Sequence, residues 1–173
     1  KKNKQTPAEN TEKMNQLVST LVKFEEFIKN NAPLKDVLPT LYDKYKYRYE
    51  NYTIRQLCQE MHDFYKKHDA KKYQKELFRQ KSFPTQAMLP REANIELVRN
   101  NAKLVPLKNI VGKVALQGAL PYPPGVFCVV PGEIWNEIAQ KYFLILEEGI
   151  NIFPGFSPEI QGVYLEEENG VTK

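Results

Sequence analysis

Residues 118–133 read GALPYPPGVFCVVPGE, and this stretch decides how the second half of the chain folds. Each proline fixes its own φ angle at about −65° and holds the preceding residue in an extended conformation. Gly125 and Gly132 each follow a proline and allow the backbone to turn. Because residues 126–130 are all apolar, they predict a short strand inside a packed sheet. The pattern therefore predicts a rigid loop anchored on a buried strand.

Tyr122 is the candidate binding residue of this loop, because its side chain combines a flat apolar ring with a hydroxyl group. Binding groups are often placed on loops that a rigid scaffold holds in position. The residues that shape the loop around it are Pro121, Pro123, Pro124 and Gly125. A purely structural turn, whose tyrosine only covers the core, remains the alternative.

The length of 173 residues suits one domain, or one domain with an appendage. Apolar residues make up 42% of the chain, but the sequence contains no run of about 18 or more of them, the length needed to span a membrane. Cys58 and Cys128 are expected to be free thiols in apolar surroundings, and no secretory signal is recognisable. We therefore expect a cytoplasmic protein. Since the chain begins with Lys1 rather than Met, it could be a piece of a longer protein.

Positive charge is concentrated in the first half of the sequence. Residues 1–85 hold 18 Lys and Arg against 11 Asp and Glu, whereas residues 86–173 hold 7 against 10. The run KYKYRY at 44–49 interleaves basic and aromatic residues, as some nucleic-acid-binding surfaces do. Acidic residues interrupt this half throughout, so a solvated helical surface is the favoured interpretation.

Helical patterns dominate the first half. Thr6–Glu9 has the form of a capping box for a helix that runs to about Asn30, and Pro33 and Pro39 interrupt the helical pattern beyond it. A second capping box at 53–56 begins a helix with an apolar stripe of Ile54, Leu57, Cys58, Met61, Phe64 and Tyr65. Asp69 is expected to cap a further helix.

Strand-like runs dominate the second half, at 103–107, 113–116 and 125–130, after one short helix near 91–100. Gly112 predicts a turn between the first two strands, which would then pair antiparallel. A helix is expected to open at Glu133 and to stop at Gly149. The predicted class is α+β: N-terminal helices followed by a small mixed or antiparallel sheet with a packed helix.

Few residues suggest catalysis. His62 and His68 are the only histidines; they are six residues apart and are expected to face solvent rather than bind a metal. Cys128 lies within the predicted strand without a neighbouring base, so it is interpreted as core filler. The sequence shows no glycine-rich phosphate loop and no nucleophile elbow.

Three long runs together resemble the carboxyl-terminal region of the bacterial ornithine, lysine and arginine decarboxylases. They are GALPYPPGVFCVVPGE, IRQLCQEMHDFY at 54–65 and YFLILEEGINIFPGFSPEIQGVY at 142–164. The likeness extends from about Leu34 to Tyr164, so residues 1–32 would be a leading helix or linker from the preceding domain and residues 33–173 the carboxyl-terminal domain. The runs 57–60, 128–130 and 161–164 are similar to the ornithine branch.

The resemblance implies a pyridoxal-phosphate enzyme that converts ornithine to putrescine and CO2. In the family a lysine that follows a histidine holds the cofactor, but no Ser-x-His-Lys motif occurs in this sequence. We therefore expect no catalytic, cofactor-binding or metal-binding residue in this segment. The expected partners are the cofactor-binding domain of the same parent chain and further copies of the parent, in a homodimer or a higher assembly, without nucleic acid or membrane.

By the same resemblance, the loop around Tyr122 would lie toward the active-site entrance and Tyr122 would line the substrate channel. The alternative that the loop only docks one domain on another stays open. Two other function classes also remain: a free-standing interaction module, and a nucleic-acid-binding domain formed by residues 1–85.

Overall fold

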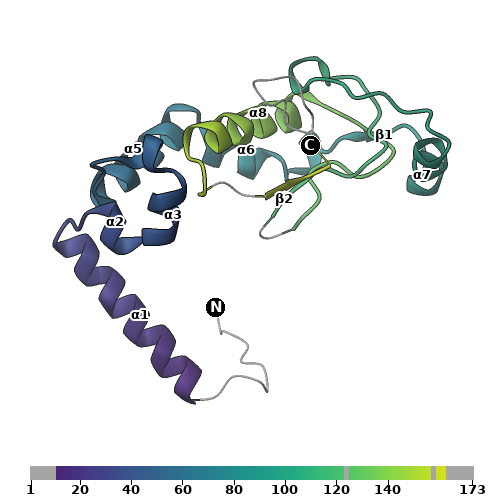
Figure 1. Cartoon of the computed structure of the whole chain (residues 1–173). Helices are drawn as coiled ribbons and strands as arrows, with labels where there is room; N and C mark the ends of the chain where they lie inside the picture. The colour runs from purple at the N-terminus through teal and green to yellow at the C-terminus, as the bar shows by residue number, and fades with distance from the viewer. Residues whose placement is uncertain (1–10, 123–124, 157–158, 163–173) are drawn as a thin grey trace. The chain divides into compact units, whose positions relative to one another are not determined.

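The computed structural model describes residues 11–122, 125–156 and 159–162 (Figure 1). The chain divides into two compact units, Lys1–His62 and Asp63–Lys173. We call these the N-terminal unit and the C-terminal unit and describe each by itself. Helices form most of the described structure, and the strands form small antiparallel pairs. The predicted α+β class is confirmed. The predicted boundary between residues 32 and 33 stays a prediction.

Short helices come after one long helix in the N-terminal unit. The elements are α1 (Thr11–Lys29), α2 (Leu34–Val37), α3 (Pro39–Lys44), α4 (Lys46–Tyr49) and the first part of α5 (Ile54–Lys67). Pro39 stands at the first position of α3, where its missing N–H costs no hydrogen bond, so it separates α2 from α3 as predicted. The predicted capping box at 6–9 lies outside the described residues.

The predicted capping box at the start of α5 is confirmed. The Thr53 backbone N–H donates to Gln56 Oε1 at 2.9 Å, and the Gln56 N–H donates to Thr53 Oγ1 at 3.4 Å. Thr53 also forms an antiparallel bridge with Pro33. The start of α5 is thereby tied to the residues that connect α1 with α2.

A small core holds these helices together, consisting of Leu34, Tyr49, Ile54 and Leu57, each at most 3% exposed. The predicted place of Cys58 in the apolar stripe of α5 was wrong, because this residue is exposed. Its neighbour Leu57 takes the buried position, because adjacent residues on a helix point in different directions.

Two strand pairs organise the C-terminal unit. Strand β1 (Thr85–Gln86) pairs with β3 (Glu133–Ile134), and β2 (Leu120–Tyr122) pairs with β4 (Glu159–Gln161), both antiparallel. The helical elements of this unit are α6 (Ala70–Glu76), η1 (Gln80–Ser82), α7 (Pro90–Val98), η2 (Leu107–Asn109) and α8 (Glu137–Ile152).

The predicted strand positions were wrong. Residues 103–107, 113–116 and 125–130 form no extended ladder; Val114 and Val129 make only isolated bridges, to Ile134 and Ala119. The turn at Gly112 exists, with φ +81°, but no strand pair flanks it. The apolar runs predicted burial only in part, since Leu104, Val126 and Phe127 are exposed, and strand pairing depends on partners that are distant in sequence.

The two ends of α8 and the cap of α6 also differ from prediction. Helix α8 begins at Glu137 rather than Glu133, because Glu133 pairs with β1. It continues past Gly149 to Ile152, and Gly149 is buried close to the Tyr65 ring. Asp69 precedes α6 but makes no capping bond with its side chain; its φ is +53°.

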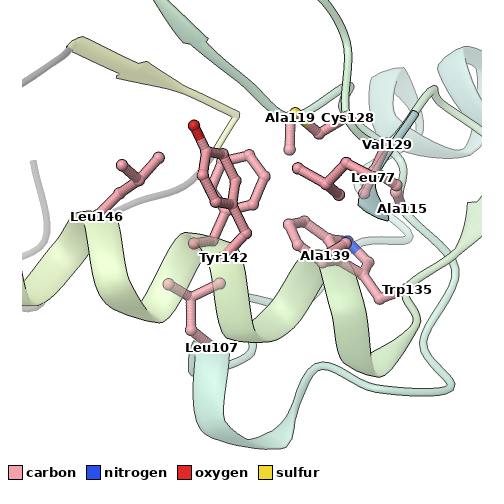
Figure 2. Packing of buried hydrophobic residues seen from close by; sticks show 11 residues of the cluster. Leu77, Leu107, Ala115, Ala119, Cys128, Val129, Trp135, Ala139, Tyr142 and Leu146 are labelled. Atoms are coloured by element: carbon pink, nitrogen blue, oxygen red, sulfur yellow. The ribbon is translucent and has the colours of Figure 1, made fainter. Parts of the chain in front are cut away.

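Helix α8 carries the main core of the C-terminal unit (Figure 2). Its inward face contributes Ala139, Tyr142, Phe143 and Leu146, against which Val129 and Trp135 pack. The other members of the cluster are Leu77, Leu107, Ala115, Ala119 and Cys128. Ala119 and Val129, at the two ends of the proline loop, therefore both lie on this core.

Candidate functional site

The proline loop is closed at its base by backbone hydrogen bonds. The Ala119 N–H donates to the Val129 carbonyl at 2.9 Å, and the Cys128 N–H donates to the Ala119 carbonyl at 2.9 Å. Ala119 and Val129 are both fully buried. The loop of residues 120–128 thus starts and ends at one point on a packed core.

One arm of the loop is strand β2. In the register of the pair, Leu120 lies opposite Gln161, Pro121 opposite Ile160 and Tyr122 opposite Glu159. Pro121 is buried. The structure therefore places the backbone of Tyr122 at the end of a paired strand. Pro123 and Pro124 lie outside the described residues.

The other arm of the loop returns through Gly125, whose N–H donates to the Pro121 carbonyl at 3.2 Å and whose φ is +72°. Val126 and Phe127 come next and are 47% and 50% exposed. This arm therefore presents apolar side chains to the surroundings, whereas sequence reasoning expected both of them in a buried strand.

The second proline-glycine corner is bound tightly to its neighbours. The Gly132 N–H donates to the Ala115 carbonyl at 2.7 Å, and the Val130 N–H donates to Glu133 Oε2 at 2.7 Å. Gly132 has φ +91°, and a Cβ there would collide with the Met88 carbonyl oxygen. Only glycine fits this position without displacing the backbone.

Cys128 is buried at 7% exposure, and this burial raises the pKa of its thiol to about 11. A nucleophilic cysteine needs a lowered pKa, since the thiolate is the reactive form. The interpretation of Cys128 as core filler is confirmed by its place in the core cluster.

The two histidines lie in different surroundings. His62 is exposed, as expected. His68 is half-buried: its ring centre is 4.6 Å from that of Phe64, and its Nε2 is 3.7 Å from a Glu148 carboxylate oxygen. Across the described ranges, no three His, Cys, Asp or Glu side chains are grouped closely enough to hold a metal ion.

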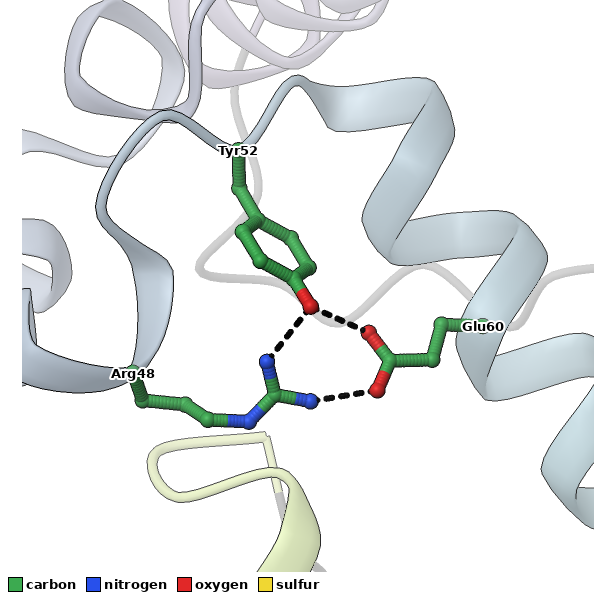
Figure 3. Close-up of polar contacts among 3 residues, drawn as sticks. All are labelled: Arg48, Tyr52 and Glu60. Atoms are coloured by element: carbon green, nitrogen blue, oxygen red, sulfur yellow. Dashed lines mark hydrogen bonds and ion pairs between the residues drawn. The ribbon is translucent and has the colours of Figure 1, made fainter.

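Sequence reasoning missed a polar cluster in the N-terminal unit, formed by Arg48, Tyr52 and Glu60 (Figure 3). Arg48 donates to the Tyr52 hydroxyl at 2.7 Å and to Glu60 Oε1 at 2.5 Å, and the Tyr52 hydroxyl donates to Glu60 Oε2 at 2.9 Å. Burial lowers the pKa of Arg48, but the hydrogen bonds from Tyr52 and Glu60 and the Glu60 charge outweigh it, so the pKa is raised. Arg48 and Tyr52 are four residues apart, but Tyr52 lies beyond the end of α4, so the helical i, i+4 rule does not predict their contact.

The basic and aromatic run at 44–49 is not one continuous surface. Tyr49 is fully buried, and that burial raises its pKa to about 12. Arg48 points into the polar cluster, while Tyr47 is 81% exposed. The run therefore mixes core, ion-pair and surface positions.

Comparison with known proteins identifies the family. The family described as "Orn/Lys/Arg decarboxylase, C-terminal domain" matches residues 71–173. The chain belongs to this family, and the expected resemblance is confirmed.

Ornithine decarboxylases are the more similar relatives. The inducible ornithine decarboxylase of Lactobacillus is 59% identical over 163 residues, covering 94% of this chain and 22% of that protein. The constitutive ornithine decarboxylase of Escherichia coli is 55% identical, covering 93% and 23%. The lysine decarboxylase LdcA of Pseudomonas aeruginosa is 32% identical, covering 87% and 20%. The chain thus spans about a fifth of the length of these relatives.

Solved structures with the same fold include two lysine decarboxylases. The constitutive enzyme of Escherichia coli matches with a TM-score of 0.82 and 28% identity, over 95% of this chain and 23% of that chain. Lysine decarboxylase A of Pseudomonas aeruginosa matches with a TM-score of 0.83 and 30% identity, over 93% and 22%. No helix within the described ranges is long and apolar enough to cross a bilayer.

Proposed function

We propose that this chain is the carboxyl-terminal domain of an ornithine decarboxylase that converts ornithine to putrescine and CO2 with pyridoxal phosphate. The observation that carries the proposal is the contrast in identity: 59% to an ornithine decarboxylase against 32% to a lysine decarboxylase, over nearly the whole chain. The cytoplasmic location and the assembly of the parent into a homodimer or a higher oligomer remain predictions.

The lysines in the described part of this chain do not have the surroundings that a cofactor-binding lysine needs. A lysine that forms a Schiff base normally sits in a desolvated pocket that lowers its pKa. Every lysine in the described part of this chain is exposed. We therefore propose that the parent polypeptide binds the cofactor elsewhere, and we assign no chemical step to this domain.

An assay of the parent polypeptide tests the substrate. We expect kcat/KM for ornithine to exceed the values for lysine and arginine at least about tenfold, the difference that about 1.4 kcal/mol of transition-state binding provides. A preference for lysine or arginine would contradict the proposal. The 173-residue chain mixed with pyridoxal phosphate should not gain aldimine absorbance.

Tyr122 is proposed to line the substrate channel of the parent, with the proline loop holding it at the entrance. Two facts support this: the loop is fixed at its base by Ala119 and Val129, and Val126 and Phe127 of its return arm are about half exposed. A tyrosine at this place would offer a ring face and a hydroxyl to the ammonium end of ornithine.

Two substitutions in the parent test this role. We expect Tyr122→Ala to raise KM for ornithine about fivefold or more, and Tyr122→Phe to fall between it and the natural protein if the hydroxyl contributes. Tyr47→Ala, which removes an 81% exposed ring, is the control and should change neither constant. If both Tyr122 variants keep the natural kcat and KM, the loop only docks domains.

A further inference from the structure

Helix α1 carries an apolar stripe that the described structure leaves uncovered. Its residues are spaced alternately three and four apart, the spacing of a helix-packing seam: Met14, Leu17, Leu21, Phe24 and Ile28. We call these five residues the α1 stripe. No residue of α1 is buried, and Leu17, Leu21 and Phe24 are 51%, 59% and 44% exposed.

The C-terminal end of α1 is held firmly in the N-terminal unit. Arg55 donates from Nε to the Ile28 carbonyl and from Nη2 to the Lys29 carbonyl, both at 2.7 Å. These carbonyls belong to the last turn of the helix, which a positive charge stabilises. The Ala32 N–H also donates to the Phe27 carbonyl at 3.0 Å. The stripe is therefore presented in a defined direction by the unit that carries it.

An uncovered helix of this kind needs a partner. Most helices in proteins owe their stability to packing of an apolar face rather than to helix propensity. A contiguous exposed apolar surface marks an interaction site. The charges of α1 do not favour an anionic partner: Lys13, Lys23 and Lys29 are balanced by Glu12, Glu25 and Glu26.

The comparisons indicate what covers the stripe. The chain spans about a fifth of its relatives, and the family that matches from residue 71 is described as a C-terminal domain. Most of the parent polypeptide would then precede this chain, and α1 is the described helix nearest to it in sequence. We propose that the α1 stripe packs against an apolar surface of the preceding part of the same parent polypeptide. The inference rests on the proposed function in one respect, that the chain is part of a longer decarboxylase.

Cysteine labelling of the parent tests the proposal. Leu21→Cys and, independently, Leu17→Cys place a thiol on the stripe, while Ser19→Cys places one on the opposite, exposed face as the matched control. Trypsin cleavage after Lys13 and Lys23 releases residues 14–23, one peptide that contains all three positions and no natural cysteine. Mass spectrometry of this peptide measures the rate of maleimide labelling at each position.

We expect both stripe thiols of the folded parent to react about tenfold or more slowly than the thiol of Ser19→Cys, because a buried thiol reacts only after local opening. In the 173-residue chain the three rates should agree within about threefold. Equal rates in the parent at both stripe positions would overturn the proposal. Protection in the 173-residue chain that grows with its concentration would also overturn it, since a second copy would then cover the stripe.

The outcomes separate this proposal from the proposed function. A parent that prefers lysine but protects the stripe would refute the ornithine assignment and support the docking of α1. A parent that decarboxylates ornithine but leaves both stripe thiols as reactive as the control would refute only the docking. The three single variants should turn over ornithine at similar rates, which confirms that each parent is folded.

Discussion

The cluster of Arg48, Tyr52 and Glu60 shows how single polar residues stabilise a unit with a small core. All three side chains bond to one another, so the charged groups lose water but gain partners. The Arg48 side chain is 21% exposed and the Glu60 side chain 38%, which places the ion pair between a surface pair and a buried one. Its contribution is therefore moderate.

Glu60→Gln removes the charge and preserves the shape of the side chain. We expect a loss of about 1 kcal/mol in the free energy of unfolding, because a charge-assisted hydrogen bond becomes neutral in a partly screened position. Urea unfolding of the 173-residue chain measures it. Glu50→Gln, at an exposed position of the same unit, is the control and should change stability by less than about 0.5 kcal/mol. Equal effects would show that the cluster contributes nothing specific.

At the scale of elements, one side chain at the start of helix α8 both caps the helix and bonds to a segment distant in sequence. The Asn136 Oδ1 accepts from the Ala139 N–H at 2.9 Å and caps the helix, while its Nδ2 donates to the Ser82 carbonyl at 2.9 Å. The cap therefore also binds the η1 segment to α8. Since α8 carries most of the core, its first turn influences the whole C-terminal unit.

Asn136→Ala should lower the free energy of unfolding by about 1 to 2 kcal/mol, because it removes the cap and leaves the Ser82 carbonyl without this donor. Thermal or urea unfolding of the chain measures the change. Asn94→Ala removes an exposed asparagine from within α7, where alanine favours the helix, and should be neutral or slightly stabilising. A loss no greater than that of Asn94→Ala would contradict the capping role.

A comparison of Gly132 with Gly112 separates the cost of a positive φ from the cost of a steric clash. Both have positive φ, +91° and +81°, but a Cβ at Gly132 meets the Met88 carbonyl whereas nothing lies within 4 Å of one at Gly112. We expect Gly112→Ala to cost about 1 kcal/mol and Gly132→Ala at least about 2 kcal/mol more. Unfolding of both variants by urea measures the difference. Equal losses would mean that the corner at Gly132 adapts to a side chain.

At the scale of the whole molecule, a buried thiol and a buried phenol make the free energy of unfolding fall at high pH. Burial raises the pKa of Cys128 from its usual 9 to about 11 and that of Tyr142 from 10 to about 12. These groups ionise at a lower pH in the unfolded chain than in the folded one. The stabilisation that comes from keeping them neutral is therefore fully present below about pH 9, and it is lost as the pH rises toward about 11 for the thiol and about 12 for the phenol.

Cys128→Ala should remove part of this pH dependence. The natural chain is expected to lose on the order of 1 to 2 kcal/mol between about pH 8.5 and 10.5 through this thiol, and the variant should show a flatter profile. Its absolute stability will be lower because of the lost packing, so the slope is the informative quantity. Cys58→Ala, at the exposed thiol, should keep the natural slope. A slope unchanged by Cys128→Ala would contradict the role of thiol burial.

Local patterns predicted the elements whose signals lie within a few residues. The Thr53 and Gln56 capping box, the helix it begins and the separation of short helices at Pro39 depend on neighbouring side chains and were confirmed. The strand positions and the start of α8 were wrong, since β1 pairs with β3 across more than forty residues of intervening chain. At the candidate site, the closed loop base and the buried Cys128 agree with expectation, while the exposure of Phe127 does not.

The sequence by itself determined the class, the capping box at Thr53 and Gln56 and the family, because composition, periodicity and long motifs are properties of the chain alone. Only the tertiary structure decided which apolar residues are covered. Val129 and Phe127 are alike in sequence terms, yet one is fully buried and the other half exposed. The same holds for Leu57 in the core and Leu21 on the α1 stripe. Burial depends on which distant segments meet in space, and no pattern within one segment contains that information.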